Sequence, residues 1–172
     1  MAEHGYQFDI VTAEVEEALP AHLTVRETVL FNALRKGSAV AASHPGAVII
    51  AADTLVALDG QPLGKPASLD EARRMLGNLN GRTHQVFSAV WIEHRAAGRL
   101  AAFIEVSQVR FRTLNAREIE DYIQKVHVLD KAGAYAAQED PIGLIAGIQG
   151  SRTNVIGLPM ERLVPILAQQ GF

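Results

Sequence analysis

The chain has 172 residues, no cysteine and a formal net charge of −3 at neutral pH. The lack of cysteine excludes disulfides and cysteine-ligated metals, and the weak negative charge gives no electrostatic basis for nucleic acid or an anionic membrane as the main partner. With 48% hydrophobic and 20% charged residues the composition is globular. No long apolar run or signal peptide is recognisable, so we expect one domain, residues 1–172, in the cytoplasm.

The first half of the chain predicts two strands around one helix. Residues 6–11 alternate between apolar and polar and predict a strand. Thr24 and Glu27 form a capping box that begins a helix ending near Ser43, before a His-Pro-Gly stop. The continuous apolar run 48–52 then predicts a strand buried on both faces, with Asp53 at its carboxyl end.

The second half predicts further helices and a long hairpin. A capping box at Ser68 begins one helix, and residues 115–118 begin another. Between these helices, residues 85–94 and 100–112 predict two long strands joined by a glycine-containing turn. A glycine-punctuated segment with short strands follows, and a last helix begins close to Pro159. Helices interleaved with a buried strand and a hairpin indicate an α/β fold with a mixed sheet.

Asp53 and Lys65 form the strongest candidate site. Ligand sites of α/β proteins lie at the carboxyl ends of core strands, and the turn predicted at Asp59-Gly60 folds the chain back toward Asp53. A carboxylate and an ammonium group together suit a magnesium-bound phosphate, because the carboxylate binds metal or activates water while the lysine neutralises phosphate oxygens. The alternative is that Asp53 caps its own turn beside a surface lysine.

Acidic and basic side chains before and on the first helix are weaker candidates. Glu14, Glu16 and Glu17 follow the first predicted strand and could hold a divalent cation or form a solvated acidic loop. Lys36 lies on the first predicted helix, where most lysines are surface groups.

Two glycine-containing segments near the C-terminus also have ligand-binding character. Residues 130–135 lead from a charged pair that includes Lys131 into small residues that allow close approach of a ligand, and Gln138 offers a donor and an acceptor to a base edge. Residues 150–154 could bind phosphate, although loops of this composition are usually structural. No Walker loop, dinucleotide fingerprint or nucleophile elbow is present.

Taken together, these segments resemble the Maf family of nucleoside triphosphate pyrophosphatases over nearly the whole chain. The resemblance is carried by blocks that occur in family order: Ala52-Asp53-Thr54, Gly64-Lys65-Pro66, residues 79–84, residues 130–135 with Gln138, and residues 150–159. It implies hydrolysis of a nucleoside triphosphate to a monophosphate and pyrophosphate with Mg²⁺ or Mn²⁺. It also implies a curved mixed sheet with helices, two lobes and a cleft, akin to the inosine-triphosphatase-like fold, and a homodimer.

The resemblance also assigns roles to individual residues. Asp53 matches the family's general base or metal carboxylate, and Glu17 matches the acidic residue that shares the metal. Lys36 and Lys65 match the helix lysine and the phosphate-side lysine of the catalytic set, while Lys131 is expected to bind phosphate. Thr54 and Gln138 match positions linked to base selection and resemble the subgroup that acts on dTTP and UTP.

One departure from the family pattern concerns the N-terminus. Met1 stands only a few residues before the matching segment at Gly5, so the Ser-x-Ser-Pro-Arg-Arg loop that begins other family members has no counterpart here. Its arginines would each contribute roughly 1.5–3 kcal/mol as charged hydrogen bonds to phosphate. We therefore expect an N-terminally shortened member with impaired activity; the alternative is a catalytically weakened protein that binds nucleotide or regulates.

Overall fold

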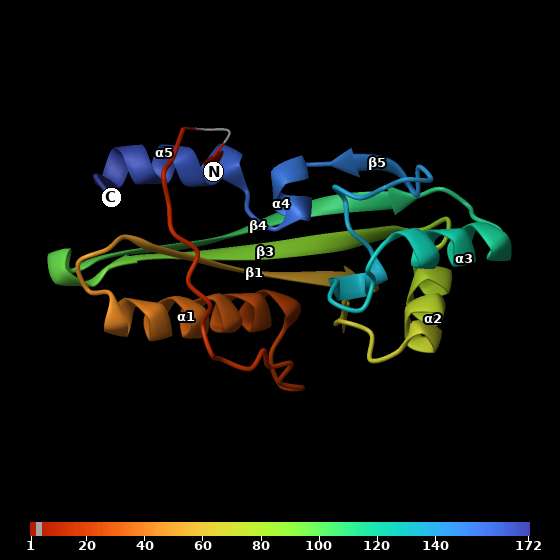
Figure 1. The fold of residues 1–172 in the computed structure, drawn as a ribbon, viewed down its shortest axis with the longest axis horizontal. Coiled ribbons are helices and arrows are strands. Elements are labelled where there is room, and N and C mark those ends of the chain that lie inside the picture. The colour runs from red at the N-terminus through yellow and green to blue at the C-terminus, as the bar shows by residue number, and fades with distance from the viewer. Residues whose placement is uncertain (3–4) are drawn as a thin grey trace.

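The structure, a computed structural model, describes residues 1–2 and 5–172 and is built on one antiparallel sheet (Figure 1). Five strands follow the order β2-β1-β3-β4-β5. Their bounds are Ile49–Leu58 for β1, Gln61–Leu63 for β2, Thr83–His94 for β3, Arg99–Phe111 for β4 and Ile145–Gln149 for β5. The α/β fold with a sheet flanked by helices is confirmed.

The prediction of a mixed sheet was wrong, because every strand pair within the described residues is antiparallel. Two of the pairs, β1–β2 and β3–β4, are hairpins, whose short connections require antiparallel strands. The first hairpin turns at Asp59 and Gly60, which have φ values of 52° and 77°. Positive φ at both turn residues gives the twist that two-residue hairpins prefer.

The α-helices are α1 Val25–Ser43, α2 Leu69–Leu79, α3 Ala116–Lys125, α4 Arg152–Ile156 and α5 Met160–Gln170. Three helices, α1, α2 and α3, begin where their capping residues predict, α5 begins directly after Pro159 without a side-chain cap, and the short α4 was not predicted. Thr24 and Asn115 each form a complete capping box. At α2, the Ser68 hydroxyl accepts from the Glu71 amide as expected, while the Glu71 carboxylate accepts from the amide of Ala67 instead of Ser68.

Two expectations about the first half of the chain were wrong. Residues 6–11 form no strand; they run as an irregular segment, and Ile10 is 88% exposed. No strand of residues 1–2 and 5–172 pairs with this segment, and pairing is what makes an alternating segment a strand. Residues 48–52 are not buried on both faces: Val48 is exposed and 49–52 are half-buried, whereas the buried residues of β1 are Asp53 and 55–58.

Helices cover both faces of the sheet, and this arrangement positions the site. On one face α1 packs against the centre of β1 and β3, where Val29 and Ala33 meet Leu55, Phe87 and Ala89. The opposite face is covered by α5 at one end of the strands and by α4 toward the other end (Figure 1). The short 3-10 helix η3, Ala132–Ala134, shares a core cluster with Val56 of β1 and Val155 of α4. Across the described residues, no helix has the length and apolar character needed to span a membrane.

Gly37 tests the packing of α1 against β3. A Cβ atom at position 37 would lie 2.4 Å from Cδ1 of Trp91 and 3.3 Å from Cβ of Ala51. We expect Gly37→Ala to lower the free energy of unfolding by about 1–3 kcal/mol, because overpacking outweighs the better helix propensity of alanine.

The matched control for this substitution is Gly77→Ala in α2. A Cβ atom at position 77 would meet no atom within 4 Å. With no steric clash at this position, only the higher helix propensity of alanine relative to glycine remains, and it should raise the free energy of unfolding by up to about 1 kcal/mol. Urea unfolding of both variants measures the difference, and an unchanged stability for Gly37→Ala would contradict the close contact with Trp91.

Candidate active site

A cavity of about 310 Å³ lies where α1, β1, η3 and α4 approach one another. Its size falls within the range of small-molecule sites. The seven residues to which the family resemblance assigned a role line this cavity, namely Glu17, Lys36, Asp53, Thr54, Lys65, Lys131 and Gln138. The weaker candidates Glu14, Glu16 and residues 150–154 are not among the residues that line it. The fold therefore brings together residues that are spread over most of the chain.

Asp53 lies in the middle of β1, so the prediction that it ends the strand was wrong. β1 pairs with β2 only over Val56–Leu58, and no described strand pairs with the same edge at Asp53 and Thr54. Neighbouring residues of a strand point to opposite faces of a sheet. At this unpaired edge both side chains still reach the cavity, Asp53 from the α1 face and Thr54 from the α4 face.

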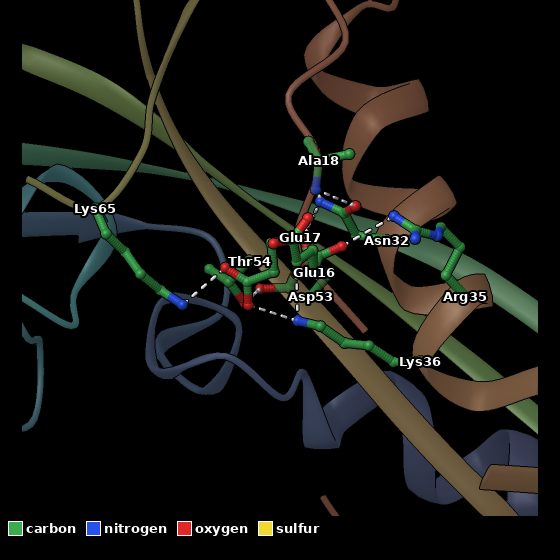
Figure 2. Close-up of polar contacts among 10 residues, drawn as sticks. Glu16, Glu17, Ala18, Asn32, Arg35, Lys36, Asp53, Thr54 and Lys65 are labelled. Atoms are coloured by element: carbon green, nitrogen blue, oxygen red, sulfur yellow. Dashed lines mark hydrogen bonds and ion pairs between the residues drawn. The ribbon is translucent and has the colours of Figure 1, made fainter. Parts of the chain in front are cut away.

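Four charged side chains form a continuous chain of ion pairs along the wall (Figure 2). Lys36 Nζ donates to Asp53 Oδ1 at 2.7 Å and to Glu17 Oε1 at 2.8 Å. Lys65 Nζ donates to the other oxygen of Glu17, Oε2, at 2.7 Å. The sequence prediction that the turn at Asp59 brings Lys65 toward Asp53 is confirmed, with Glu17 and Lys36 standing between the two.

Asn32 is a member of the site that the sequence analysis missed. Its side chain is buried and donates from Nδ2 to Asp53 Oδ2 at 3.3 Å and to the carbonyl of Ala18 at 3.0 Å, while Oδ1 accepts from the amide of Ala18 at 3.0 Å. Asn32 thereby orients Asp53 and holds the segment that carries Glu17. A signal was available, since Asn32 stands four residues before Lys36 and so on the same helix face.

The opposite wall comes from residues 130–138. Lys131 forms an ion pair with Asp130 at 2.9 Å, and Gln138 lies exposed at the rim of the cavity. Tyr135 lines the cavity with a buried ring, and its hydroxyl lies 2.8 Å from Nε2 of the buried His84. The rings of His84, Phe111 and Tyr135 pack edge to face, so this wall is fixed from behind by the core.

Comparison with known proteins agrees with this geometry. Residues 1–170 match the family described as Maf-like protein. This chain belongs to the Maf family. The resemblance predicted from the sequence motifs is thus confirmed.

Three relatives illustrate how far the similarity to other Maf proteins extends, and each is named dTTP/UTP pyrophosphatase. The protein of Akkermansia muciniphila is 41% identical over 168 residues, covering 98% of this chain and 88% of the relative. That of Symbiobacterium thermophilum is 42% identical over 168 residues, covering 98% and 86%. That of Myxococcus xanthus is 40% identical over 173 residues, covering 100% and 86%. The match to the Myxococcus xanthus protein therefore extends over the whole part of the chain that forms the cavity wall.

The ion pairs determine the charge state of the site. Partial burial raises the pKa of Glu17, but hydrogen bonds and charges from Lys36 and Lys65 outweigh it and hold the pKa below its usual value. Partial burial lowers the pKa of Lys36, and its hydrogen bonds to Asp53 and Glu17 reverse that effect and raise the pKa above its usual value. Near neutral pH, Glu17 is consequently a carboxylate and Lys36 an ammonium group.

The donor set of this Maf site fits a divalent cation bound together with phosphate. Mg²⁺ is usually held by one or two carboxylates, with substrate phosphates and water completing the shell. Asp53 and Glu17 supply two carboxylates that converge on the same ammonium group of Lys36. Within residues 1–2 and 5–172 no cluster of three or more His, Asp or Glu side chains could hold a metal alone, so further ligands would have to come from the substrate and water.

His84 makes the stability of the protein sensitive to acid. Burial lowers its pKa from 6.5 to about 4. Between these values the unfolded chain binds a proton that the folded protein does not, so stability is full above pH 6.5 and falls as the pH drops toward 4, by up to about 3 kcal/mol.

We expect His84→Gln to remove this part of the acid sensitivity, because glutamine does not titrate. The measurement is the free energy of unfolding in urea between pH 7 and pH 4.5 for wild type and variant. Replacement of the exposed His22 by glutamine is the control and should leave the pH dependence as it is. An equally steep loss of stability in His84→Gln would rule out His84 as its source.

Proposed function

We propose that this protein hydrolyses nucleoside triphosphates to nucleoside monophosphates and pyrophosphate, with dTTP and UTP preferred. The observation that carries the proposal is the convergence of two carboxylates and three lysines on one cavity of nucleotide-binding size. The names of the relatives, which are about 40% identical over almost the whole chain, support the same activity. They favour an active enzyme over a catalytically weakened nucleotide-binding or regulatory protein.

In the proposed reaction, water attacks the α-phosphorus. A bond forms between the water oxygen and this phosphorus, the bond to the oxygen that bridges the α- and β-phosphorus breaks, and pyrophosphate leaves. Asp53 takes the proton of the attacking water, as its low exposure and its fixed orientation against Asn32 and Lys36 suit a general base. Lys65 and Lys131, on different walls of the cavity, neutralise phosphate oxygens.

Glu17 and Lys36 have supporting roles in this proposal. Lys36 keeps the two carboxylates side by side, and Glu17 keeps Lys65 directed into the cavity. Asp53 and Glu17 would together hold Mg²⁺ or Mn²⁺, which when bound neutralises charge on the phosphate oxygens.

Base preference is assigned to Gln138 and Thr54. The amide of Gln138 offers both an acceptor and a donor, which match the N3–H and O4 of uracil or thymine. In the structure Gln138 is exposed at the cavity rim, so a bound base would cover it. A polar group left unpaired by the wrong base costs roughly 1–3 kcal/mol, which is the basis for preferring UTP and dTTP over ATP and GTP.

The setting of the proposed activity is the cytoplasm, where the nucleoside triphosphate pool lies. We also propose a homodimer as the working form.

Product analysis tests the reaction class. Wild-type protein incubated with UTP or dTTP and Mg²⁺ or Mn²⁺ should release pyrophosphate and the monophosphate in equal amounts. Ion-exchange chromatography of the nucleotides, with an assay for pyrophosphate, measures both products. Orthophosphate as the first product, with a nucleoside diphosphate beside it, would contradict attack at the α-phosphorus.

Asp53→Asn tests the proposed base. The substitution replaces the carboxylate by an amide of nearly the same shape. The new amide N–H would face Nδ2 of Asn32, so that two hydrogen-bond donors would face each other. We expect a fold that is retained with a stability loss of about 1–2 kcal/mol, and a fall in kcat of several orders of magnitude.

The control for this variant is Asp59→Asn. Asp59 lies at the end of the same strand, outside the cavity, in an exposed ion pair with Arg82. Its positive φ is compatible with asparagine. Asp59→Asn should turn over substrate like wild type, and wild-type activity in Asp53→Asn would remove Asp53 from the mechanism.

A further inference from the structure

The hydroxyl group of Thr54, which lines the cavity, forms a hydrogen bond with the buried residue Ser88. Thr54 Oγ1 lies 2.8 Å from Ser88 Oγ, its register partner on β3. Ser88 Oγ lies in turn 2.9 Å from the carbonyl oxygen of Asn154 on α4. Ser88 is completely buried, so no bulk water replaces either contact.

The direction of each hydrogen bond in this chain follows from counting protons. Two oxygen atoms 2.9 Å apart need a proton between them, and the Asn154 carbonyl has none to give, so Ser88 donates its only hydroxyl proton to Asn154. Ser88 Oγ is then an acceptor toward Thr54, and the proton in that contact must come from the Thr54 hydroxyl. The Thr54 oxygen therefore presents only lone pairs to the cavity.

We infer that Ser88 is a positioning residue for base specificity: it forces Thr54 to act as a pure hydrogen-bond acceptor, and the site thereby prefers uracil and thymine to cytosine. The inference rests on the proposed function and on Thr54 facing the base. Uracil and thymine carry a donor, N3–H, at the position where cytosine carries an acceptor, N3. A fixed acceptor can share the N3–H proton of uracil or thymine with the Gln138 amide oxygen in a three-centre hydrogen bond, and it meets N3 of cytosine with two lone pairs facing each other.

Gln138 alone does not make this distinction. Its amide presents a donor and an acceptor, and a 180° turn about its last side-chain bond exchanges them. Gln138 at the exposed rim can thus match the O4 and N3–H of uracil in one orientation and the N4–H and N3 of cytosine in the other. Discrimination between these two bases needs a group whose polarity is fixed, and Thr54 held by Ser88 is such a group.

The network around Ser88 supplies the rigidity that this role requires. Asn154 is buried and its Nδ2 donates to the Val86 carbonyl at 3.1 Å and to Ser107 Oγ at 2.9 Å. Ser107 Oγ donates to the Ser151 carbonyl at 3.0 Å. The carbonyl that receives the Ser88 proton is therefore fixed by hydrogen bonds to both β3 and β4, through atoms other than those of Thr54.

The test compares binding of UTP and CTP analogues in which a methylene group replaces the oxygen between the α- and β-phosphorus. Isothermal titration calorimetry gives Kd for each analogue, and kcat/KM for UTP and CTP is measured in parallel. Wild type should prefer the uridine compounds by about tenfold or more. Ser88→Ala frees the Thr54 proton to point into the cavity, and we expect the preference to fall by about fivefold or more, chiefly through tighter binding of the cytidine compounds.

Ser107→Ala is the matched control. It removes an equally buried hydroxyl from the same network without touching Thr54, so it should lower stability while leaving the uridine-to-cytidine ratio as in wild type. A merely structural role for Ser88 predicts that Ser88→Ala and Ser107→Ala behave alike. Should Ser88→Ala not fold, Ser88→Cys takes its place, because sulfur keeps the volume but accepts hydrogen bonds only weakly.

A double-mutant cycle tests whether Ser88 acts through Thr54. Thr54→Ser should keep the preference, Thr54→Val should lose it, and Ser88→Ala should change nothing further in the Thr54→Val background. An unchanged ratio in Ser88→Ala and Ser88→Cys, or equal binding of both analogues by wild type, would overturn the inference and leave pyrophosphate release untouched. Discrimination between the analogues without any turnover would support the inference and overturn the proposed function.

Discussion

The contact on which the site depends is the ammonium group of Lys36 held between Asp53 and Glu17. The Asp53 side chain is 4% exposed, and a carboxylate at such a position is unfavourable unless a positive charge and hydrogen bonds compensate it. Lys36 and Asn32 provide both from one face of α1. The same two residues also bind the segment that carries Glu17, so the docking of α1 on β1 and the assembly of the charged wall are one event.

The unpaired edge of β1 explains how two neighbouring residues of one strand, Asp53 and Thr54, can both line the cavity. Pleating sends Asp53 to the face covered by α1 and Thr54 to the face covered by α4. A strand paired on both sides would keep such neighbours apart. β2 pairs with β1 only from Val56 onward, so the edge of β1 at Asp53 and Thr54 is open to the cavity. The carboxylate of Asp53 and the hydroxyl group of Thr54 therefore line one cavity, although they lie on opposite faces of the sheet.

The two sides of the cavity are held by different kinds of interaction. The charged side is a chain of ion pairs that ends at the exposed Lys65, and a nucleotide that enters can exchange partners with it. The neutral side is a chain of short hydrogen bonds that ends in the core at Asn154, where no partner can be exchanged without breaking a buried contact. The first arrangement suits phosphate binding and proton transfer, and the second suits recognition of a base.

Local sequence determined the helix starts, the long β3–β4 hairpin and the chemistry of the site. Capping at Thr24 and Asn115 depends on residues three apart, and carboxylates and lysines suited to phosphate are recognisable as residue types in family order. Tertiary structure alone decided that residues 6–11 are not a strand, that Asp53 lies in mid-strand, and that Ser88 contacts Thr54 behind the cavity. The spacing of Asn32 and Lys36 places both on one helix face, but only the fold shows that Asn32 donates to Asp53. Each of these depends on partners far away in the chain: a neighbouring strand that is present or absent, and hydrogen bonds spanning 21 to 66 residues. Spacing along the sequence carries no record of such contacts.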